Sequence, residues 1–176
     1  MDFWRHLKTV QRHRHLVRQY CFRLGLYWQG LTHDLSKFSP VEFWAGVKYF
    51  QGDRSPNDAQ RRDKGYSASW MHHKGRNRHH FEYWTDLSPK TRTYEPVDMP
   101  VRYLCEMVAD RIAACKTYQG AAYTDASPLQ YLDRANESRL RFLLTMLAER
   151  GEKETFRFLR GVVLKGKPFA EEQPTP

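Results

Sequence analysis

Residues 99–120, MPVRYLCEMVADRIAACKTYQG, carry the strongest structural signal in the chain. Apolar residues recur here at steps of three and four, which is the period of an α-helix with a buried face. Pro100 suits the first helical position and Gly120 is a natural stop, so the segment predicts a helix from Pro100 to Tyr118. Asp110 lies inside the apolar run. Because an unpaired charge is costly in a protein core, its carboxylate needs a partner.

The same period continues on both sides of this helix. Residues 3–24 repeat it and end at a glycine. Residues 39–42, SPVE, combine a capping serine, a proline at the first helical position and a glutamate three residues after the cap, which predicts a helix that runs to Gly52. The polar residues 52–65 and 86–98 predict surface loops, and no segment has a convincing strand pattern. Further helical segments are expected at residues 67–84, with Gly75 and Asn77 as candidate breaks, and at residues 127–151 and 152–165.

Length and composition limit the architecture. The chain has 176 residues and a mass of 21.0 kDa, which is the size of one ordinary domain. Hydrophobic residues make up 40% of it, enough for a packed core. We therefore expect an all-α, single-domain helical bundle over residues 1–167, followed by a flexible C-terminal tail over residues 168–176.

The sequence also favours one compartment. No apolar stretch approaches the ~20 residues of a membrane span. The opening residues, MDFWRHLK, lack the pattern of a secretory signal peptide. The three cysteines lack the spacing of a zinc site or a disulfide framework. We expect a soluble, cytoplasmic chain with no membrane partner, and the oligomeric state stays open.

Charges and histidines are distributed unevenly. Residues 1–80 contain 15 Lys and Arg against 6 Asp and Glu, whereas the remaining residues carry 14 of each. All eight histidines also lie within the first 80 residues. Excess basic charge favours an anionic partner such as a phosphate, a nucleic acid or a membrane surface. The clustered imidazoles add metal binding to these options.

The His33-Asp34 pair places a nitrogen donor and an oxygen donor at one point of the backbone. A carboxylate can also bridge two ions, which suits hydrolytic sites with two metals. Alone, such a pair often arises by chance. Residues 72–73 and 79–80 are two further histidine pairs, seven residues apart. On a continuous helix that spacing is about two turns, so their first members would share one face and their second members another. The alternative is a polar, solvated helix face.

These motifs occur in a recognisable order: HRHLV, then GLYWQGLTHDLSKFSPVEF, then SWMHHKGRNRHHFEYW, then MPVRYLCEMVADRIAACKTYQG. In this order the chain resembles the HD-domain superfamily of metal-dependent phosphohydrolases, and within it a small bacterial and phage family. The resemblance covers about residues 10–125. It implies a helical bundle of the HD type built around a metal centre.

The resemblance also implies roles for individual residues. It assigns the first metal to His13, His33, Asp34 and Asp110. His13 is preferred over His15 because His13 and Val17 match the superfamily's His-x-x-x-Val step. The further histidines would bind a second metal or contact substrate phosphate, and their roles remain open: His72, His73, His79 and His80. Glu82 and Glu106 are candidates for supporting or proton-transfer roles.

Lys37 distinguishes branches of the superfamily. Phosphohydrolase members often carry a lysine three residues after the aspartate, whereas the di-iron oxygenase branch tends to place a histidine there. The resemblance therefore implies a phosphohydrolase in which one or two divalent ions (Mn, Fe, Co, Ni, Zn or Mg) activate water. Asp34 would orient that water and Lys37 would stabilise charge on the phosphate. Lys74, Arg76 and Arg78, between the histidine pairs, would neutralise further phosphate oxygens.

The implied substrate is a small phosphorylated molecule, with a nucleotide favoured. Two other functions remain in view: a di-iron oxygenase on the same scaffold, and a basic nucleic-acid-binding protein whose metal is structural or absent. Some residues also have ordinary structural explanations. His6 and His15 are expected on the surface, and Asp110 could pair with Arg102 or Arg111 in the core.

Overall fold

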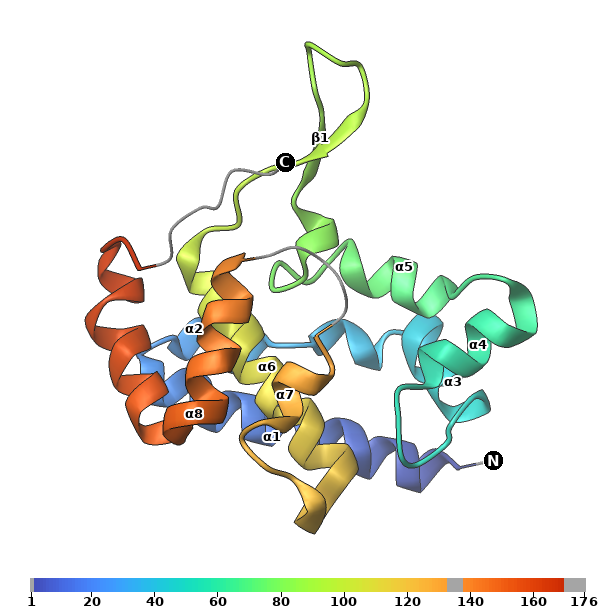
Figure 1. Ribbon diagram of the computed structural model, residues 1–176. Coiled ribbons are helices and arrows are strands. Elements are labelled where there is room, and N and C mark those ends of the chain that lie inside the picture. Colours follow the sequence, from blue (N-terminus) through green and yellow to red (C-terminus); the bar gives the residue numbers. More distant parts are fainter. Residues whose placement is uncertain (1, 133–137, 170–176) are drawn as a thin grey trace.

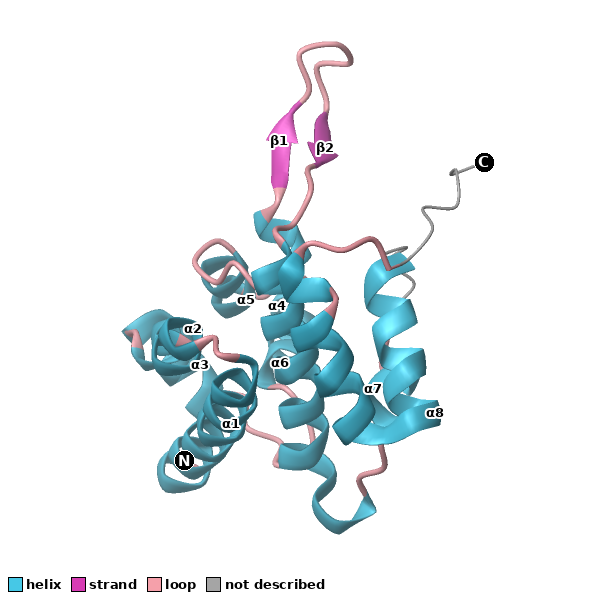
Figure 2. Ribbon diagram, turned by 90° about the vertical axis from the view of Figure 1, so that its left-hand side faces the viewer, coloured by secondary structure: helices cyan, strands magenta, loops and turns pink. Residues whose placement is uncertain are grey.

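The computed structural model describes residues 2–132 and 138–169, which form one helical domain (Figure 1). Its longest helices are α1 (Phe3–Leu24), α6 (Val101–Gln119) and α8 (Ser138–Gly161). Helix α6 packs against both others, and Figure 2 shows it in the middle, with α1 on one side and α8 on the other. The expected all-α, single-domain fold is confirmed.

Four shorter helices follow α1: α2 (Tyr27–Thr32), α3 (Pro40–Lys48), α4 (Pro56–Lys64) and α5 (Ala68–Lys74). Of these, α2 and α3 pack against α1, and α3 also packs against α4 and α5. Helix α7 (Ser127–Gln130) packs against α6 and α8. The described chain also contains four short 3-10 helices: η1 (Leu35–Phe38), η2 (Phe81–Tyr83), η3 (Gly120–Ala122) and η4 (Val163–Lys165).

The hydrophobic core surrounds α6. Leu104, Val108 and Ile112 are fully buried there against Val17 of α1 and the leucines of α8. Almost every side of α6 is therefore covered by another element. Its carboxylates consequently lie within the protein, as the apolar surroundings of Asp110 in the sequence indicated.

Several predicted boundaries are confirmed. The helix expected from Pro100 to Tyr118 is α6, and Ser39 caps α3 by accepting a hydrogen bond from the backbone N–H of Glu42 at 3.5 Å. Helix α3 nevertheless ends at Lys48, before Gly52. Gly151 (φ 74°) interrupts α8, so two helical segments meet where the sequence placed a break. Within the helical region expected at 127–151, residues 133–137 lie outside the described part.

The expected absence of strands is wrong. Residues 86–98 were expected to form a loop, but β1 (Thr85–Leu87) and β2 (Tyr94–Pro96) pair antiparallel, with Asp86 opposite Glu95. Figure 2 shows this hairpin projecting from the helices. Each strand has three residues and almost no buried side chain. Such a hairpin lacks the apolar alternation by which strands are recognised in a sequence.

Two further expectations need correction. Residues 52–65 contain a helix, α4, which Ser55 caps and Pro56 opens, although Gln60 is its only buried residue. Without an apolar face, its polar composition resembles a loop. The helical stretch expected from 67 to 84 ends at Lys74, and the chain turns at Gly75, which is one of the two breaks that the sequence offered.

The predicted tail and the membrane expectation can be compared with the structure only in part. Phe169, expected in the flexible tail, packs its ring 6.0 Å from those of Phe142 and Phe158. The remaining tail residues, 170–176, lie outside the described part. Among the described helices, none has the length and apolarity needed to cross a membrane.

Candidate metal centre

Four side chains from three parts of the chain converge on one site, and we call them the first cluster. His13 comes from α1, His33 and Asp34 from the connection between α2 and η1, and Asp110 from α6. His33 and Asp34 are almost fully buried, at 2% and 1% exposure. The set implied for a first metal is therefore brought together by the fold.

The spacing within the first cluster fits a single cation. Nε2 of His13 lies 3.0 Å from Oδ1 of Asp110 and 3.3 Å from Nε2 of His33. Oδ2 of Asp34 is 3.5 Å from Nε2 of both histidines. Ligands about 2.1 Å from one ion lie roughly 3.0–3.4 Å apart in octahedral or tetrahedral arrangements. The donor atoms thus surround a space of the size a transition metal or Mg²⁺ takes.

A second cluster shares Asp34 and adds His73, His79 and His80. Nε2 of His73 lies 3.0 Å from Nε2 of His80. Oδ1 of Asp34 is 3.3 Å from Nε2 of His73 and 3.4 Å from Nε2 of His79. One oxygen of Asp34 therefore faces each cluster. The geometry also separates the four histidines that the sequence left open: three lie in the second cluster, and His72 does not.

The two histidine pairs meet because the chain turns between them, and not because they share a face of one continuous helix. After α5 ends, Nδ2 of Asn77 donates to the carbonyl of His73 and to Oγ of Ser36, both at 2.8 Å. These bonds fold the chain back against η1. His80 consequently returns to His73, while His79 contacts Glu106 of α6 and lies 4.4 Å from His33 between ring centres.

Asp34 adopts an uncommon backbone conformation, with φ at 54°. Aspartate tolerates this left-handed region better than most residues, although it still costs free energy. The guanidinium of Arg14 donates to the carbonyl of His33 at 2.8 Å and steadies the turn. Strain of this kind is typical of functional sites. Here it accompanies the placement of two adjacent donors, His33 and Asp34, in the same cluster.

Four buried side-chain polar atoms lack hydrogen-bond partners in the described part of the chain, and two of them belong to the second cluster: Oδ1 of Asp34 and Nε2 of His79. They face each other across 3.4 Å in the second cluster. Leaving such atoms unsatisfied in a protein interior is costly. A carboxylate oxygen and an imidazole nitrogen are both common metal ligands, so the residues present fit a bound cation.

Two further carboxylates orient the histidines. Nδ1 of His33 and Nδ1 of His79 donate to the same oxygen of Glu106, at 2.9 and 3.2 Å. Nδ1 of His73 donates to Glu42 at 2.7 Å. A carboxylate can only accept, so each Nδ1 carries a proton, and each Nε2 faces its cluster, where its deprotonated form can bind a cation.

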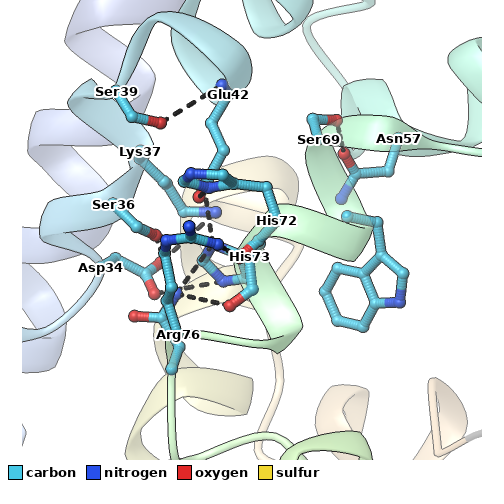
Figure 3. Close-up of polar contacts among 12 residues, drawn as sticks. Asp34, Ser36, Lys37, Ser39, Glu42, Asn57, Ser69, His72, His73 and Arg76 are labelled. Carbon is cyan, nitrogen blue, oxygen red and sulfur yellow. Dashed lines mark hydrogen bonds and ion pairs between the residues drawn. The ribbon is translucent and has the colours of Figure 1, made fainter.

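Glu106 therefore takes the supporting place suggested for it, whereas Glu82 is exposed on η2. The role of Glu42 was missed, because in the sequence it is fully explained as the third residue of a helix. Its other oxygen accepts from His72 at 2.7 Å, which holds that histidine away from the second cluster. Figure 3 shows Glu42 reaching from α3 to the pair His72 and His73.

Negative charge dominates the site. Burial disfavours ionisation of Asp34, but His33 and Lys37 hold its pKa well below the usual range. The pKa of Asp110 is also held well below that range, by His13 and His33 against the effect of burial. Burial likewise disfavours the charged form of His33, yet Asp34 and the carboxylates of α6 raise its pKa to about 10. The ionised acids thus favour a nearby cation.

Both clusters border a cavity of about 170 Å³. Lys37 lines it, and its Nζ lies 3.3 Å from Oδ2 of Asp34. Both residues are labelled in Figure 3. His6 also lines the cavity and is only 6% exposed, so its expected surface position is wrong. His6 is buried because α3 packs against the first turns of α1, where Gly46 lies next to the His6 ring. His15 is exposed, as expected.

The other basic candidates lie outside this cavity. Lys74, Arg76 and Arg78 are absent from its lining. Arg78 donates to the hydroxyls of Tyr83 and Tyr103, and Arg76 to the carbonyl of His72 (Figure 3). The pairing of Asp110 with Arg102 or Arg111 does not occur either, because its carboxylate contacts His13 and His33.

Comparison with known proteins places the chain in a family. A family model described as DUF5662, a family of unknown function, matches residues 2–156. No curated protein and no solved structure matches the chain. The matched region contains every residue of both clusters. Since the match covers well over half of its length, the chain belongs to the DUF5662 family, whose function is unknown.

Proposed function

We propose that this protein is a metal-dependent phosphohydrolase that holds two divalent cations. The observation that carries the proposal is the position of Asp34, which presents one carboxylate oxygen to each of two adjacent donor clusters. A bridging carboxylate of this kind is typical of hydrolytic sites with two metals. His13, His33 and Asp110 would hold one ion, and His73, His79 and His80 the other.

Bound divalent cations would supply Lewis acidity, which binds phosphoryl oxygens and lowers the pKa of a water molecule towards neutrality. The chain's own residues would do the rest. Glu42 and Glu106 fix the tautomers of the histidines, so the lone pair of each Nε2 points into the site. Asp34, between the clusters, also lies where it could orient an attacking water molecule.

Lys37 supports hydrolysis over the two alternatives. Burial lowers the pKa of Lys37, but Asp34 and other acids raise it above its ordinary value, so the ammonium group stays charged. A permanent positive charge at the cavity would stabilise the charge that develops on a phosphoryl group. The clusters alone would fit two irons equally well. A basic surface for nucleic acid would need no such buried arrangement.

The cavity also limits the substrate. Its volume of about 170 Å³ is below the roughly 300–1,000 Å³ of sites that enclose drug-sized ligands. A phosphate group and the atoms next to it would fit inside. For the nucleotide favoured by the resemblance, the base would therefore lie at the opening of the cavity.

Metal analysis combined with an activity screen tests this proposal. Purified protein should contain up to two transition-metal or Mg²⁺ ions per chain and hydrolyse p-nitrophenyl phosphate or nucleotides with at least one divalent ion. Asp34→Asn should lose both metal and turnover. Asp98→Asn, whose side chain is 95% exposed, is the matched control. Turnover in metal-free protein would end the proposal, and iron with oxygen consumption but no phosphatase activity would establish the oxygenase instead.

A further inference from the structure

The cavity has a second wall, made by side chains that belong to neither cluster. His6 of α1, Lys37 of η1 and Tyr118 of α6 all line it. Lys37 interacts electrostatically with both of the others. The three polar groups therefore come from separate elements and border the same small space. Neither His6 nor Tyr118 belongs to a donor cluster, so the metal centre does not explain why these polar side chains border the cavity.

His6 is placed by close packing. It lies on α1 seven residues before His13, about two turns away on the same face. A Cβ atom added to Gly46 of α3 would lie 2.2 Å from Nε2 of His6, so only glycine at that position admits the ring. No described residue hydrogen-bonds to its imidazole, although the ring is buried. Burial, with a smaller effect of Lys37, lowers its pKa to about 4, so it is neutral near pH 7 and carries one N–H donor.

Tyr118 offers a second donor. It lies eight residues after Asp110 on α6 and borders the same cavity. No described residue hydrogen-bonds to its hydroxyl group. Burial is the main reason why its pKa lies above the ordinary value, so the hydroxyl keeps its proton and can donate. Packing alone would be served equally well by phenylalanine, so the free hydroxyl at a polar cavity suggests a ligand.

We infer that His6, Lys37 and Tyr118 together bind the oxygen atoms of a phosphoryl group that faces the two clusters. One ammonium, one imidazole N–H and one phenol O–H, each from a different element, suit an oxyanion with several oxygens to bind. This inference rests on the proposed phosphohydrolase function and adds two substrate-binding residues to it. They take over the contacts with phosphate oxygens that were expected of Lys74, Arg76 and Arg78.

The test measures the affinity of the Mn²⁺-loaded full-length protein for inorganic phosphate by isothermal titration calorimetry. Tyr118→Phe removes only the hydroxyl, and His6→Leu removes the ring nitrogens. Each should weaken phosphate binding about tenfold, as expected for one lost hydrogen bond to a charged ligand, and leave the metal content unchanged. Tyr103→Phe, on the same helix but outside the cavity, is the matched control and should bind phosphate normally.

A conservative variant separates hydrogen bonding from packing. His6→Asn keeps an N–H donor and should bind phosphate more tightly than His6→Leu, with a matching difference in KM for phosphate esters. Wild-type affinity in both Tyr118→Phe and His6→Leu would overturn the inference, while metal binding and hydrolysis by the wild type would leave the proposed function standing. Loss of metal in these variants would also overturn it, because the residues would then support the clusters. A wild-type protein that binds metal but neither phosphate nor phosphate esters would overturn both.

Discussion

Replacing Glu106 by glutamine should weaken both metal sites at once. A single oxygen of Glu106 accepts a hydrogen bond from His33 in the first cluster and from His79 in the second. Glutamine has the same shape but no charge, so each imidazole becomes a poorer ligand. The fold should survive, because glutamine fills the same volume and its side-chain oxygen can still accept a hydrogen bond, although the metal-free protein loses the favourable interaction between this carboxylate and the two histidines.

The size of the effect follows from these contacts. Losing a carboxylate behind a metal-bound histidine typically costs 10- to 100-fold in metal affinity, or about 1.4–2.7 kcal/mol for each ion. With metal in excess, the stabilisation that it confers falls by the same amount at each site. In a domain of this size, 1 kcal/mol shifts Tm by roughly 2–4 °C. Two weakened sites should therefore lower Tm in the presence of metal by roughly 5–20 °C.

Thermal unfolding with and without EDTA measures this difference. Each protein is melted in EDTA and again with added Mn²⁺ or Zn²⁺, and the rise in Tm caused by the metal should be smaller for Glu106→Gln than for the wild type, whatever their difference in EDTA. Glu82→Gln, at an exposed position, serves as control. The same metal-induced rise in Tm for Glu106→Gln and wild type would refute the role of Glu106 behind the two clusters.

Three other changes test separate parts of the structure. Gly46→Ala should lower the free energy of unfolding in urea by about 1–3 kcal/mol, because the added Cβ would meet His6. The control Gly161→Ala, whose added Cβ has no atom within 4 Å, should cost nothing. If Gly46→Ala were as stable as the wild type, the His6 ring would have to lie elsewhere. Lys37→Ala should lower kcat/KM for phosphate esters more than it lowers metal content, and the opposite pattern would make Lys37 structural. Burial alone would raise the pKa of Glu152, but the bonds to Lys116 and Tyr20 outweigh it, and the pKa lies below its ordinary value of 4.5. The contribution of Glu152 to the free energy of unfolding is therefore complete above pH 4.5 and is lost as the pH falls through the lowered pKa. Glu152→Gln should thus cost about 1–2 kcal/mol at pH 7 in urea unfolding and progressively less below pH 4.5, and a cost that does not depend on pH would argue against this ion pair.

Helices with a buried face were predictable, and elements without one were not. α6 and the start of α3 followed from apolar period, capping serine and proline, all of which are local properties. α4 carries a similar Ser-Pro start but buries only Gln60. Without apolar residues at helical spacing, its sequence looks like that of a polar loop. The β1–β2 hairpin is held by backbone pairing between exposed residues, which leaves almost no trace in side-chain chemistry.

The site divides in the same way. The order of the motifs carried the resemblance to the HD-domain superfamily, and that resemblance implied His13, His33, Asp34 and Asp110 as one set of ligands. His6 and Glu42 carried no such signal, because a histidine in a basic helix and a glutamate at a helix start each have an ordinary local explanation. Their burial comes from packing of α3 against α1 and α5, which no local pattern describes.

The sequence by itself determined that this protein is helical, which helices are amphipathic, and which residue types can bind a cation. Those properties depend on neighbours within a few positions along the chain. Only the tertiary structure decided that His73, His79 and His80 form one cluster while His72 turns to Glu42, and that His6 enters the cavity where Lys74, Arg76 and Arg78 do not. Distances between donor atoms depend on how α1, α5 and α6 pack together, and a shift of one turn in any of them would regroup the ligands.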